Sequence, residues 1–324
     1  MHANYHEVVH QMESFGVQFR DGRDLPLRID APRRVTCGRG GKWWYWLRTF
    51  RPNAGGNYIV GRFGSYKTGQ SVKVEVDWRP LSEAERERLR AERAAAEARA
   101  REAREREARL AAMSAAELWR EAGAQGHSAY LERKQVRAES CRYLRDGSIV
   151  VPLLRYDLPR DQALMGVQRI WGDGRKRFTA GFAKTGCALR LGRVEDAGPV
   201  LVCEGYATAL TLRMASERPV FMALDAYNLA PVLAIVRALH PDNPVLVCAD
   251  DDWRTRNVEG QLENVGVLRA WAAVRQVERC HVTRPVFIGP RGPKDTDFND
   301  LHCREGLDEV RAQLAPALEV LHAA

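Results

Sequence analysis

From Pro199 onward, short apolar segments alternate with longer segments in which apolar residues recur at helical spacing. Strands that alternate with helices form a mostly parallel sheet covered on both faces, so this part of the chain is expected to have an α/β fold. Asn228 is expected to cap the second helix, and Pro316 is expected to follow the last one. The expected strands are 200–203, 219–224, 244–249 and 282–288, and the expected helices are 206–215, 228–239, 259–274 and 306–314.

Acidic clusters occur at three places in this α/β region. Glu-Gly at 204–205 and Asp-Asp-Asp at 250–252 each follow an expected strand, and Asp-Phe-Asn-Asp at 297–300 lies in a loop before the last helix. Ligands of such sheets bind outside the carboxyl ends of the strands. Carboxylates brought together there repel one another unless a cation lies between them, and Mg²⁺ is the usual one. One cluster alone could equally be a turn or a helix cap, but three together favour a magnesium-dependent phosphoryl- or nucleotidyl-transfer site.

Charge and cysteine content narrow the class of protein. The formal net charge of +8 and the pI of about 9.3 favour an anionic partner, of which nucleic acid is the commonest. The seven cysteines are scattered and form no C-x-x-C pair, which argues against a zinc ribbon and a disulfide framework, so no zinc is expected. There is no signal peptide, and no apolar run approaches the roughly 18 residues of a membrane span, so we expect a cytoplasmic protein without membrane contact.

Residues 1–80 are expected to form a small β-rich or α+β module with an unusual aromatic run, Trp-Trp-Tyr-Trp at 43–46. Alternation along a strand places the first and third of these rings on one face and the second and fourth on the other. We expect most of the rings to be packed in a core, while the remaining face is a candidate contact for single-stranded DNA. The candidate contacts are Arg39, Lys42, Trp44 and Trp46. The expected helix is 5–15, and the expected strands are 41–48, 58–63 and 71–78.

Residues 81–123 consist almost entirely of Ala, Glu, Arg and Leu, which predicts one long helix between this module and the rest of the chain. Ser82 and Glu85 have the spacing of a capping box. Glu nearly balances Arg along the helix, which favours a solvated spacer over a nucleic-acid-binding helix. Only the C-terminal end is expected to be buried, through Leu110, Met113, Leu118 and Trp119.

Residues 124–196 are expected to form an antiparallel sheet that carries positive charge. The expected strands are 148–154, 164–171, 175–178 and 188–191. Basic side chains of this block, with one further lysine before the third acidic cluster, are predicted to hold a triphosphate and the backbone of a template. Each of them alone is equally well explained as ordinary surface charge. These residues are Arg169, Lys176, Arg177, Lys184 and Lys294.

Several of these segments together resemble a known family. The segments LVCEGYATA at 201–209, VCADDD at 247–252 and KDTDFNDL at 294–301 resemble the Toprim domain of primases from phages, conjugative plasmids and integrative elements. The Asp-Asp-Asp-Trp-Arg-Thr that starts at 250, with Glu-Asn-Val-Gly at 263–266, is similar to the D-D-D-x-x-T…G-N-P-G pattern of that group, with valine in place of the usual proline. The preceding block is similar to the basic subdomain of bacterial primases. The resemblance covers about 145–320, and residues 197–324 are identified as the Toprim catalytic domain.

The resemblance implies roles for individual residues. Glu204 is expected to act as an acid or base or to position metal, and Asp250 and Asp252 are expected to bind Mg²⁺ (or Mn²⁺). Asp297 and Asp300 are expected to form a second metal site. Bacterial primases often carry an N-terminal zinc ribbon, which is absent here, so template selection is expected to use something else.

The function implied is that of a DNA primase, which synthesises short RNA primers from NTPs on a single-stranded DNA template during replication of a phage or mobile element. The sequence contains no helicase domain, so a replicative helicase is expected to act in trans. Two alternatives remain open at this point. One is a Toprim nuclease or topoisomerase-type strand-cleaving enzyme, and the other is a non-catalytic DNA-binding accessory protein of replication.

Overall fold

The computed structural model describes residues 2–20, 22–52, 55–76, 83–256 and 260–323. The chain divides into two compact units, Met1–Glu105 and Arg106–Ala324, called here the N-terminal unit and the C-terminal unit. Within the described ranges, no helix combines the length and the apolar character that crossing a membrane requires. All seven cysteines are free thiols.

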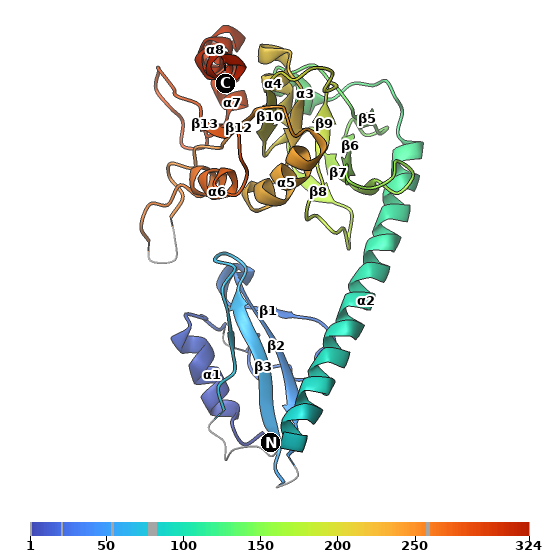
Figure 1. Cartoon of the computed structure of the whole chain (residues 1–324), viewed down its shortest axis with the longest axis vertical. Helices are drawn as coiled ribbons and strands as arrows, with labels where there is room; N and C mark the ends of the chain where they lie inside the picture. Colours follow the sequence, from blue (N-terminus) through green and yellow to red (C-terminus); the bar gives the residue numbers. More distant parts are fainter. Residues whose placement is uncertain (1, 21, 53–54, 77–82, 257–259, 324) are drawn as a thin grey trace. The chain divides into compact units, whose positions relative to one another are not determined.

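The N-terminal unit is an antiparallel sheet with one helix on its inner face (Figure 1). The aromatic run lies on β2, and Tyr45, Leu47 and Phe63 pack against Val8 and Met12 of helix α1. The expected α+β module is therefore confirmed, although its last strand is shorter than expected, and 77–78 lie outside the described residues. The elements are α1 (Tyr5–Ser14), β1 (Val35–Cys37), β2 (Trp43–Phe50), β3 (Tyr58–Ser65) and β4 (Ser71–Lys73), with the strands in that order in the sheet.

Helix α2 (Glu83–Glu121) is continuous over 39 residues and contributes to both units, as the composition predicts. The expected capping box of Ser82 and Glu85 lies outside the described residues. The face that is buried is the alanine face, because Ala96, Ala111 and Ala115 are each almost fully enclosed. The expectation that four large apolar residues anchor the C-terminal end is half wrong. Leu118 and Trp119 pack against the C-terminal unit, but Leu110 and Met113 are 59% and 63% exposed.

The C-terminal unit begins with the expected antiparallel sheet. One face of this sheet, with Ile149, Val151 and Leu153, belongs to the main core of the unit. The opposite face, with Val150 and Val167, packs against the C-terminal end of α2. The elements are α3 (Ala129–Arg133), β5 (Arg142–Tyr143), β6 (Ile149–Leu154), β7 (Leu164–Ile170) and β8 (Lys176–Phe178), with the strands in sequence order in the sheet.

A second, five-stranded sheet carries the β/α alternation. Its order is β13-β12-β10-β11-β9, and the first four strands are parallel while β9 runs antiparallel to β11. The segment at 188–191 was expected to belong to the basic antiparallel block, and this is wrong, since it supplies β9. The strands are β9 (Leu189–Leu191), β10 (Val200–Cys203), β11 (Val220–Met222), β12 (Val245–Cys248) and β13 (Cys280–Thr283).

Helices cover both faces of this sheet, as expected for a buried parallel sheet (Figure 1). Alternate strand residues point to opposite faces, so Leu201 and Leu246 lie in the core with α4, α7 and α8, whereas Val202 and Val247 lie in the core with α5 and α6. The helices are α4 (Tyr206–Ser216), α5 (Leu229–Leu239), α6 (Val265–Val274), α7 (Phe298–Glu305) and α8 (Leu307–Ala323).

The last quarter of the chain departs from expectation in four ways. The helix expected at 259–274 is α6, which begins only at Val265. The strand expected at 282–288 is β13, which ends at Thr283. The segment at 297–300 is not a loop, because α7 begins at Phe298. Pro316 lies inside α8, not beyond its end, and the helix continues because Leu321 is buried in the core shared with α4.

Asn228 precedes α5 but does not cap it through its side chain. The amide is buried and crosses to the segment before β9. Its Oδ1 accepts from Gly186 N at 2.8 Å, and its Nδ2 donates to Cys187 O and Ala223 O, each at 2.8 Å. The expected cap is therefore a bridge between two neighbouring strand ends.

Asn228→Ala is expected to lower the free energy of unfolding by about 2–3 kcal/mol, because it leaves a buried N–H and two buried carbonyl groups without partners. Urea unfolding followed by circular dichroism measures this change. Gln276→Ala, which removes an exposed amide on the surface, is the matched control and should change stability by no more than about 0.5 kcal/mol. Equal effects of the two substitutions would contradict the bridging role.

Candidate active site

Carboxylates gather at the C-terminal ends of the central parallel strands. Strands β10 and β12 are neighbours and pair in register, with Val202 opposite Val247. Glu204 follows β10 directly, and Asp250 lies two residues beyond the end of β12. The next strand of the sheet, β11, leads to Asp225, a residue that the sequence pattern did not single out. The expected convergence of the first two acidic clusters is confirmed.

Glu204 and Asp250 each bury a carboxylate oxygen that lacks a hydrogen-bond partner among the described residues, Glu204 Oε1 and Asp250 Oδ1. A buried carboxylate without a partner is costly in its charged form. Burial is the main reason that the pKa of Glu204 is raised to about 8, and the negative charges of Asp252 and Asp225 raise it further. Burial, followed by the charge of Glu204, also raises the pKa of Asp250 well above its ordinary value.

Asp252 is held by the N-terminal end of α6. Gly266 N donates to Asp252 Oδ2 at 3.0 Å, and Asn264 Oδ1 accepts from the backbone N–H of Asp252 at 2.9 Å. A Cβ on Gly266 would lie 2.2 Å from Asp250 O, so only glycine lets the helix come this close to the acidic loop. The Glu-Asn-Val-Gly segment thus has a physical role, since its asparagine and glycine hold Asp252 and let α6 approach the acidic loop.

Asp251, between the two candidate ligands, points away into a cationic cage. Its oxygens accept from Arg284 Nη1 at 2.8 Å, from Arg291 Nη1 at 2.6 Å and from Asn264. These hydrogen bonds outweigh the effect of burial and lower the pKa of Asp251. Its backbone N–H donates to Thr296 O at 2.7 Å. Asp251 therefore fastens the acidic loop to the segment before α7 and is not available as a metal ligand.

The third acidic cluster is a helix cap. Asp297 Oδ1 accepts from Asn299 N and Asp300 N at 2.7 and 2.9 Å, while Asp300 Oδ2 accepts from Thr296 N at 2.9 Å. The two aspartates form a complete capping box for α7. Asp300 Oδ1 also forms an ion pair with Lys134 Nζ at 3.2 Å.

The remaining residues of this motif hold α7 in place. Phe298 is fully buried in the main core, and the buried Asn299 donates to Lys134 O at 2.8 Å and to Thr211 Oγ1 at 3.0 Å. Asp297 nevertheless contributes to the acidic site, because its charge raises the pKa of both Glu204 and Asp250. Burial, with the charge of Asp300, raises the pKa of Asp297 itself.

Lysines surround the acidic residues. Desolvation by the surrounding protein lowers the pKa of Lys176 on β8, and the nearby charges of Asp297 and Asp250 offset only part of this shift. Burial lowers the pKa of Lys134, but the charges of Asp300 and Asp297 more than offset this and raise it. Lys184 forms an ion pair with Asp225. Two of the five predicted basic residues, Lys176 and Lys184, thus lie near the acidic residues.

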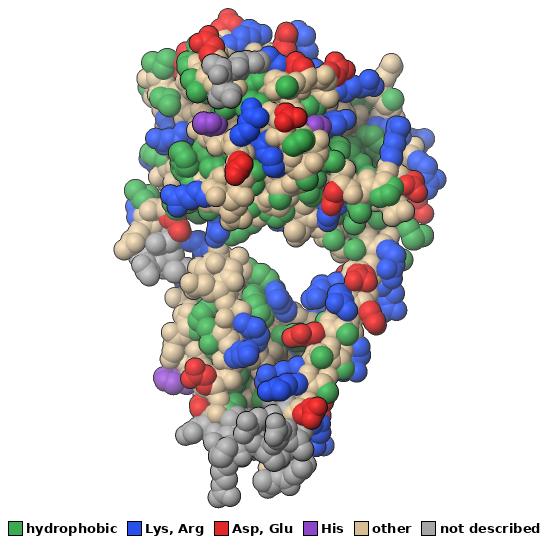
Figure 2. All heavy atoms as spheres, viewed as in Figure 1, with side chains coloured by type: hydrophobic (Ala, Val, Ile, Leu, Met, Phe, Trp, Pro, Cys, Tyr) green, Lys and Arg blue, Asp and Glu red, His purple; other side chains and the backbone are tan. Residues whose placement is uncertain are grey.

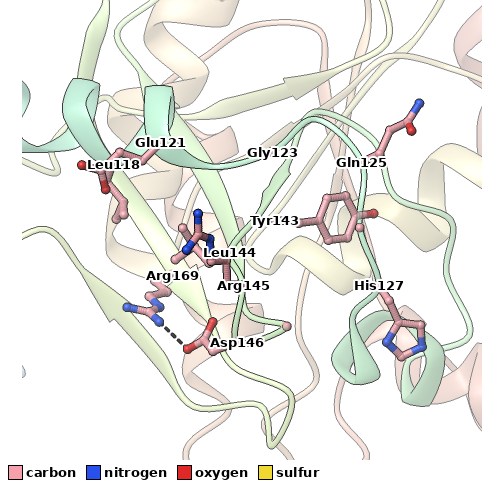
Figure 3. A pocket seen from close by; sticks show the side chains of 12 residues that line it. Leu118, Glu121, Gly123, Gln125, His127, Tyr143, Leu144, Arg145, Asp146 and Arg169 are labelled. Atoms are coloured by element: carbon pink, nitrogen blue, oxygen red, sulfur yellow. Dashed lines mark hydrogen bonds and ion pairs between the residues drawn. The ribbon is translucent and has the colours of Figure 1, made fainter.

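The predicted residues Arg169 and Arg177 lie on the other face of the antiparallel sheet. They are opposite each other in register on β7 and β8, and Arg169 shares its face with the residues packed on α2. Figure 3 shows Arg169 joined to Asp146 at a pocket of about 1140 Å³ that also contains Tyr143 and His127. This pocket is lined by both acidic and basic side chains, and none of the carboxylates at the ends of the parallel strands lines it.

The remaining predicted contacts are dispersed. Lys294 is exposed in the segment before α7. In the N-terminal unit, Trp44 is only 7% exposed, and the guanidinium of Arg34 covers its ring at 3.9 Å. Arg39 and Lys42 are exposed near the start of β2. The expectation that most of the aromatic run is packed is confirmed, because Trp43 and Tyr45 are core residues.

A divalent cation fits the chemistry of the acidic residues. Two buried carboxylate oxygens lack partners among the described residues, and burial together with neighbouring negative charge raises the pKa of both groups, so a cation would stabilise this arrangement. Within the described parts of the chain, no three His, Cys, Asp or Glu side chains are close enough together to form a complete metal site. Mg²⁺ suits such an incomplete set, since it keeps several waters and takes only one or two carboxylates from the protein.

Comparison with known proteins assigns the α/β region to a family. Residues 199–308 match the family model of the Toprim domain. Residues 199–308 are a Toprim domain. The candidate residues Glu204, Asp250, Asp252, Asp297 and Asp300 all lie within it.

The chain is also similar to the DNA primase TraC of Escherichia coli. One TraC sequence is 30% identical over 240 residues, which cover 68% of this chain and 21% of that protein. Another is 31% identical over 222 residues, which cover 67% of this chain and 15% of that protein. This chain therefore spans about a fifth, or less, of the length of these relatives. A solved DNA primase domain from Pseudomonas aeruginosa overlaps 57% of each chain at 18% identity with a TM-score of 0.34.

Sequence reasoning missed three residues around the Toprim domain site. Lys134 lies before the first expected strand of the basic block, and its partner Asp300 is 166 residues away in sequence. Asp225 carried no motif, and Arg291 was one arginine among many. No local pattern marks such residues, because their roles come from contacts between distant segments.

Without metal, the free energy of unfolding is expected to fall as the pH rises from about 4.5 to about 8. Glu204 has a folded-state pKa near 8, above its ordinary value of 4.5, so in this range the unfolded state ionises first and is favoured. Chemical unfolding in the presence of a chelator measures this dependence. Glu204→Gln is expected to flatten the curve, whereas Glu319→Gln, on the surface of α8, should leave its shape unchanged. Parallel curves for wild type and Glu204→Gln would contradict the burial of this carboxyl.

Mg²⁺ is expected to stabilise the folded chain, because it binds the carboxylates only when they converge. At about ten times the dissociation constant, the melting temperature should rise by about 2–5 °C, as measured by calorimetry. Asp250→Asn should abolish most of this rise. Asp308→Asn, which changes a carboxylate that is 95% exposed on α8, should retain it. If Mg²⁺ raises the melting temperature of Asp250→Asn as much as that of wild type, the ion binds elsewhere.

Proposed function

We propose that this chain is the catalytic core of a DNA primase that synthesises short RNA primers from NTPs on a single-stranded DNA template, by metal-dependent nucleotidyl transfer. The observation that carries the proposal is the pair of buried carboxylate oxygens, Glu204 Oε1 and Asp250 Oδ1, at the ends of two adjacent parallel strands. The similarity to the primase TraC supports it, because that similarity extends over two thirds of the chain, well beyond the Toprim domain.

The candidate metal ligands are Glu204, Asp250 and Asp252, of which one or two would contact the ion directly, and Asp297 is close enough for its charge to raise the pKa of Glu204 and Asp250. When bound, Mg²⁺ or Mn²⁺ would neutralise triphosphate charge and lower the pKa of the attacking 3′-hydroxyl. Asp300 serves the site indirectly, since its two oxygens are used by the cap of α7 and by Lys134.

The residues of the chain itself position the reactants. Without metal, the raised pKa of Glu204 suits a group that gives or takes a proton near neutral pH, whereas Glu204 as a metal ligand would be ionised. Lys176 is exposed beside the acidic residues, where its ammonium can contact the phosphates of an incoming nucleotide. The cage around Asp251 keeps Asp250 and Asp252 in place while the substrate binds.

The partners follow from this reaction. The template and the NTPs are anions, in agreement with the basic composition of the chain. We also propose that a replicative helicase supplies the template in trans and that the reaction takes place in the cytoplasm.

A priming assay tests the proposal. The full chain is incubated with single-stranded DNA, labelled NTPs and Mg²⁺ or Mn²⁺, beside Asp250→Asn and the control Asp308→Asn. We expect short labelled oligomers from wild type and the control, and a loss on the order of 100-fold in Asp250→Asn, because the reactive groups are no longer held in position.

The other outcomes identify the alternatives. Degradation of the template by wild type but not by Asp250→Asn would establish a Toprim nuclease. Retention of DNA by both proteins without any product would establish a binding protein. Either result would refute the primase proposal.

A further inference from the structure

The outer face of the N-terminal sheet carries a row of side chains across three strands. Trp46 on β2 is opposite Arg62 on β3, and Arg62 is opposite Lys73 on β4. Residues paired in register share one face of a sheet. The inner face of the same strands holds Tyr45 and Phe63 in the core, so the row points away from α1.

This outer face and the first half of α2 enclose a cavity of about 360 Å³. The helix packs there through Ala96, which is 3% exposed. Figure 2 shows Lys and Arg side chains gathered along this sheet and helix. Five cationic side chains line the cavity, against the single carboxylate of Glu97. They are Arg48, Arg62, Lys73, Arg90 and Arg93.

The charges in this cavity are poorly balanced within the protein. Arg62 and Lys73 are direct cross-strand neighbours, an arrangement that destabilises a sheet by charge repulsion. Arg62 donates to Ser71 Oγ at 3.1 Å, which satisfies one N–H but supplies no opposing charge. An anion bound in the cavity would reduce the repulsion among the cationic side chains of the strands and of the helix.

Trp46 gives the cavity a fixed aromatic wall. Its indole N–H donates to Ala31 O at 3.2 Å, which satisfies its only polar group and fixes the plane of the ring. The guanidinium of Arg48 lies over one face of the ring, 4.8 Å from its centroid, which leaves the other face for a base. A half-buried, oriented indole beside several cations combines the two elements of single-stranded nucleic-acid binding, a stacking surface and a basic groove.

We propose that this cavity binds single-stranded DNA, with phosphates on Arg62, Lys73, Arg90 and Arg93 and a base stacked on Trp46. A volume of about 360 Å³ is in the range of small-ligand pockets, and so suits an unstacked nucleotide of a single strand, not a duplex. The site lies in the unit without the acidic residues, so it goes beyond the proposed catalytic reaction. It gives the chain a second, sequence-independent grip on the template strand.

Fluorescence anisotropy with labelled oligo(dT) of about ten nucleotides tests the site in the full chain, without NTPs or divalent ions. Arg62→Ala/Lys73→Ala should weaken binding at least about tenfold and reduce the slope of log K against log salt by about 1.4, since each phosphate contact contributes about 0.7. Both side chains are exposed, so the fold should persist. The matched control Arg23→Ala/Arg28→Ala removes two exposed charges of the same unit outside the cavity and should keep the slope.

Trp46→Leu tests the stacking wall and should weaken binding several-fold without changing the salt slope. Equal losses in the cavity and control variants, or tighter binding to duplex than to single-stranded DNA, would overturn the proposal. Asp250→Asn should bind oligo(dT) like wild type. If the wild-type chain makes no primers but its DNA binding depends on the cavity, only the proposed reaction is refuted. If it makes primers but its DNA binding does not depend on the cavity, only this site is refuted.

Discussion

Repulsion between carboxylates at the ends of β10 and β12 is the constraint on which the C-terminal unit depends. The parallel sheet brings Glu204 and Asp250 together, and the described residues give their buried oxygens no partner. An arrangement of this kind persists only where the surroundings fix it firmly. That support comes from Asp251, which is bound by two arginines, and from Gly266, whose missing side chain admits α6.

Neighbouring residues of the same chemical type have opposite roles here. Asp250 and Asp251 are adjacent, yet burial near other acids raises the pKa of the first, whereas cationic hydrogen bonds lower the pKa of the second. Adjacent side chains of an extended segment point in opposite directions, so Asp250 faces the acidic site and Asp251 faces the two arginines that hold the loop. The stability that Asp251 contributes offsets the cost of holding Asp250 without a partner.

The spacing of apolar residues predicted the strands and helices around the site, because that spacing shows which face of each element is buried. This prediction failed where contacts between residues far apart in the sequence determine the structure. The segment 188–191 joins the parallel sheet through its pairing with β11, and Pro316 stays within α8 because Leu321 is buried beyond it. The Asp-Phe-Asn-Asp segment was read as a loop of ligands, although the spacing of Asp297 and Asp300 also fits a capping box. Acidic residues at strand ends were predictable, and so was a basic role for Lys184, but its pairing with Asp225 and the whole contribution of Lys134 were not.

The distribution of those lysines favours a cation beside Glu204 and Asp250 over one beside the outer acids Asp300 and Asp225. Asp300 is paired with Lys134, and Asp225 with Lys184, so the outer acids are already neutralised by the protein. Among the described residues, no lysine forms an ion pair with Glu204 or Asp250, and each has a buried oxygen without a hydrogen-bond partner. A triphosphate that approached this centre unaccompanied would meet net negative charge, whereas one that arrives with Mg²⁺ supplies the missing positive charge. Under the proposed function, the pairing of the outer acids would therefore make the binding of metal and of nucleotide mutually dependent.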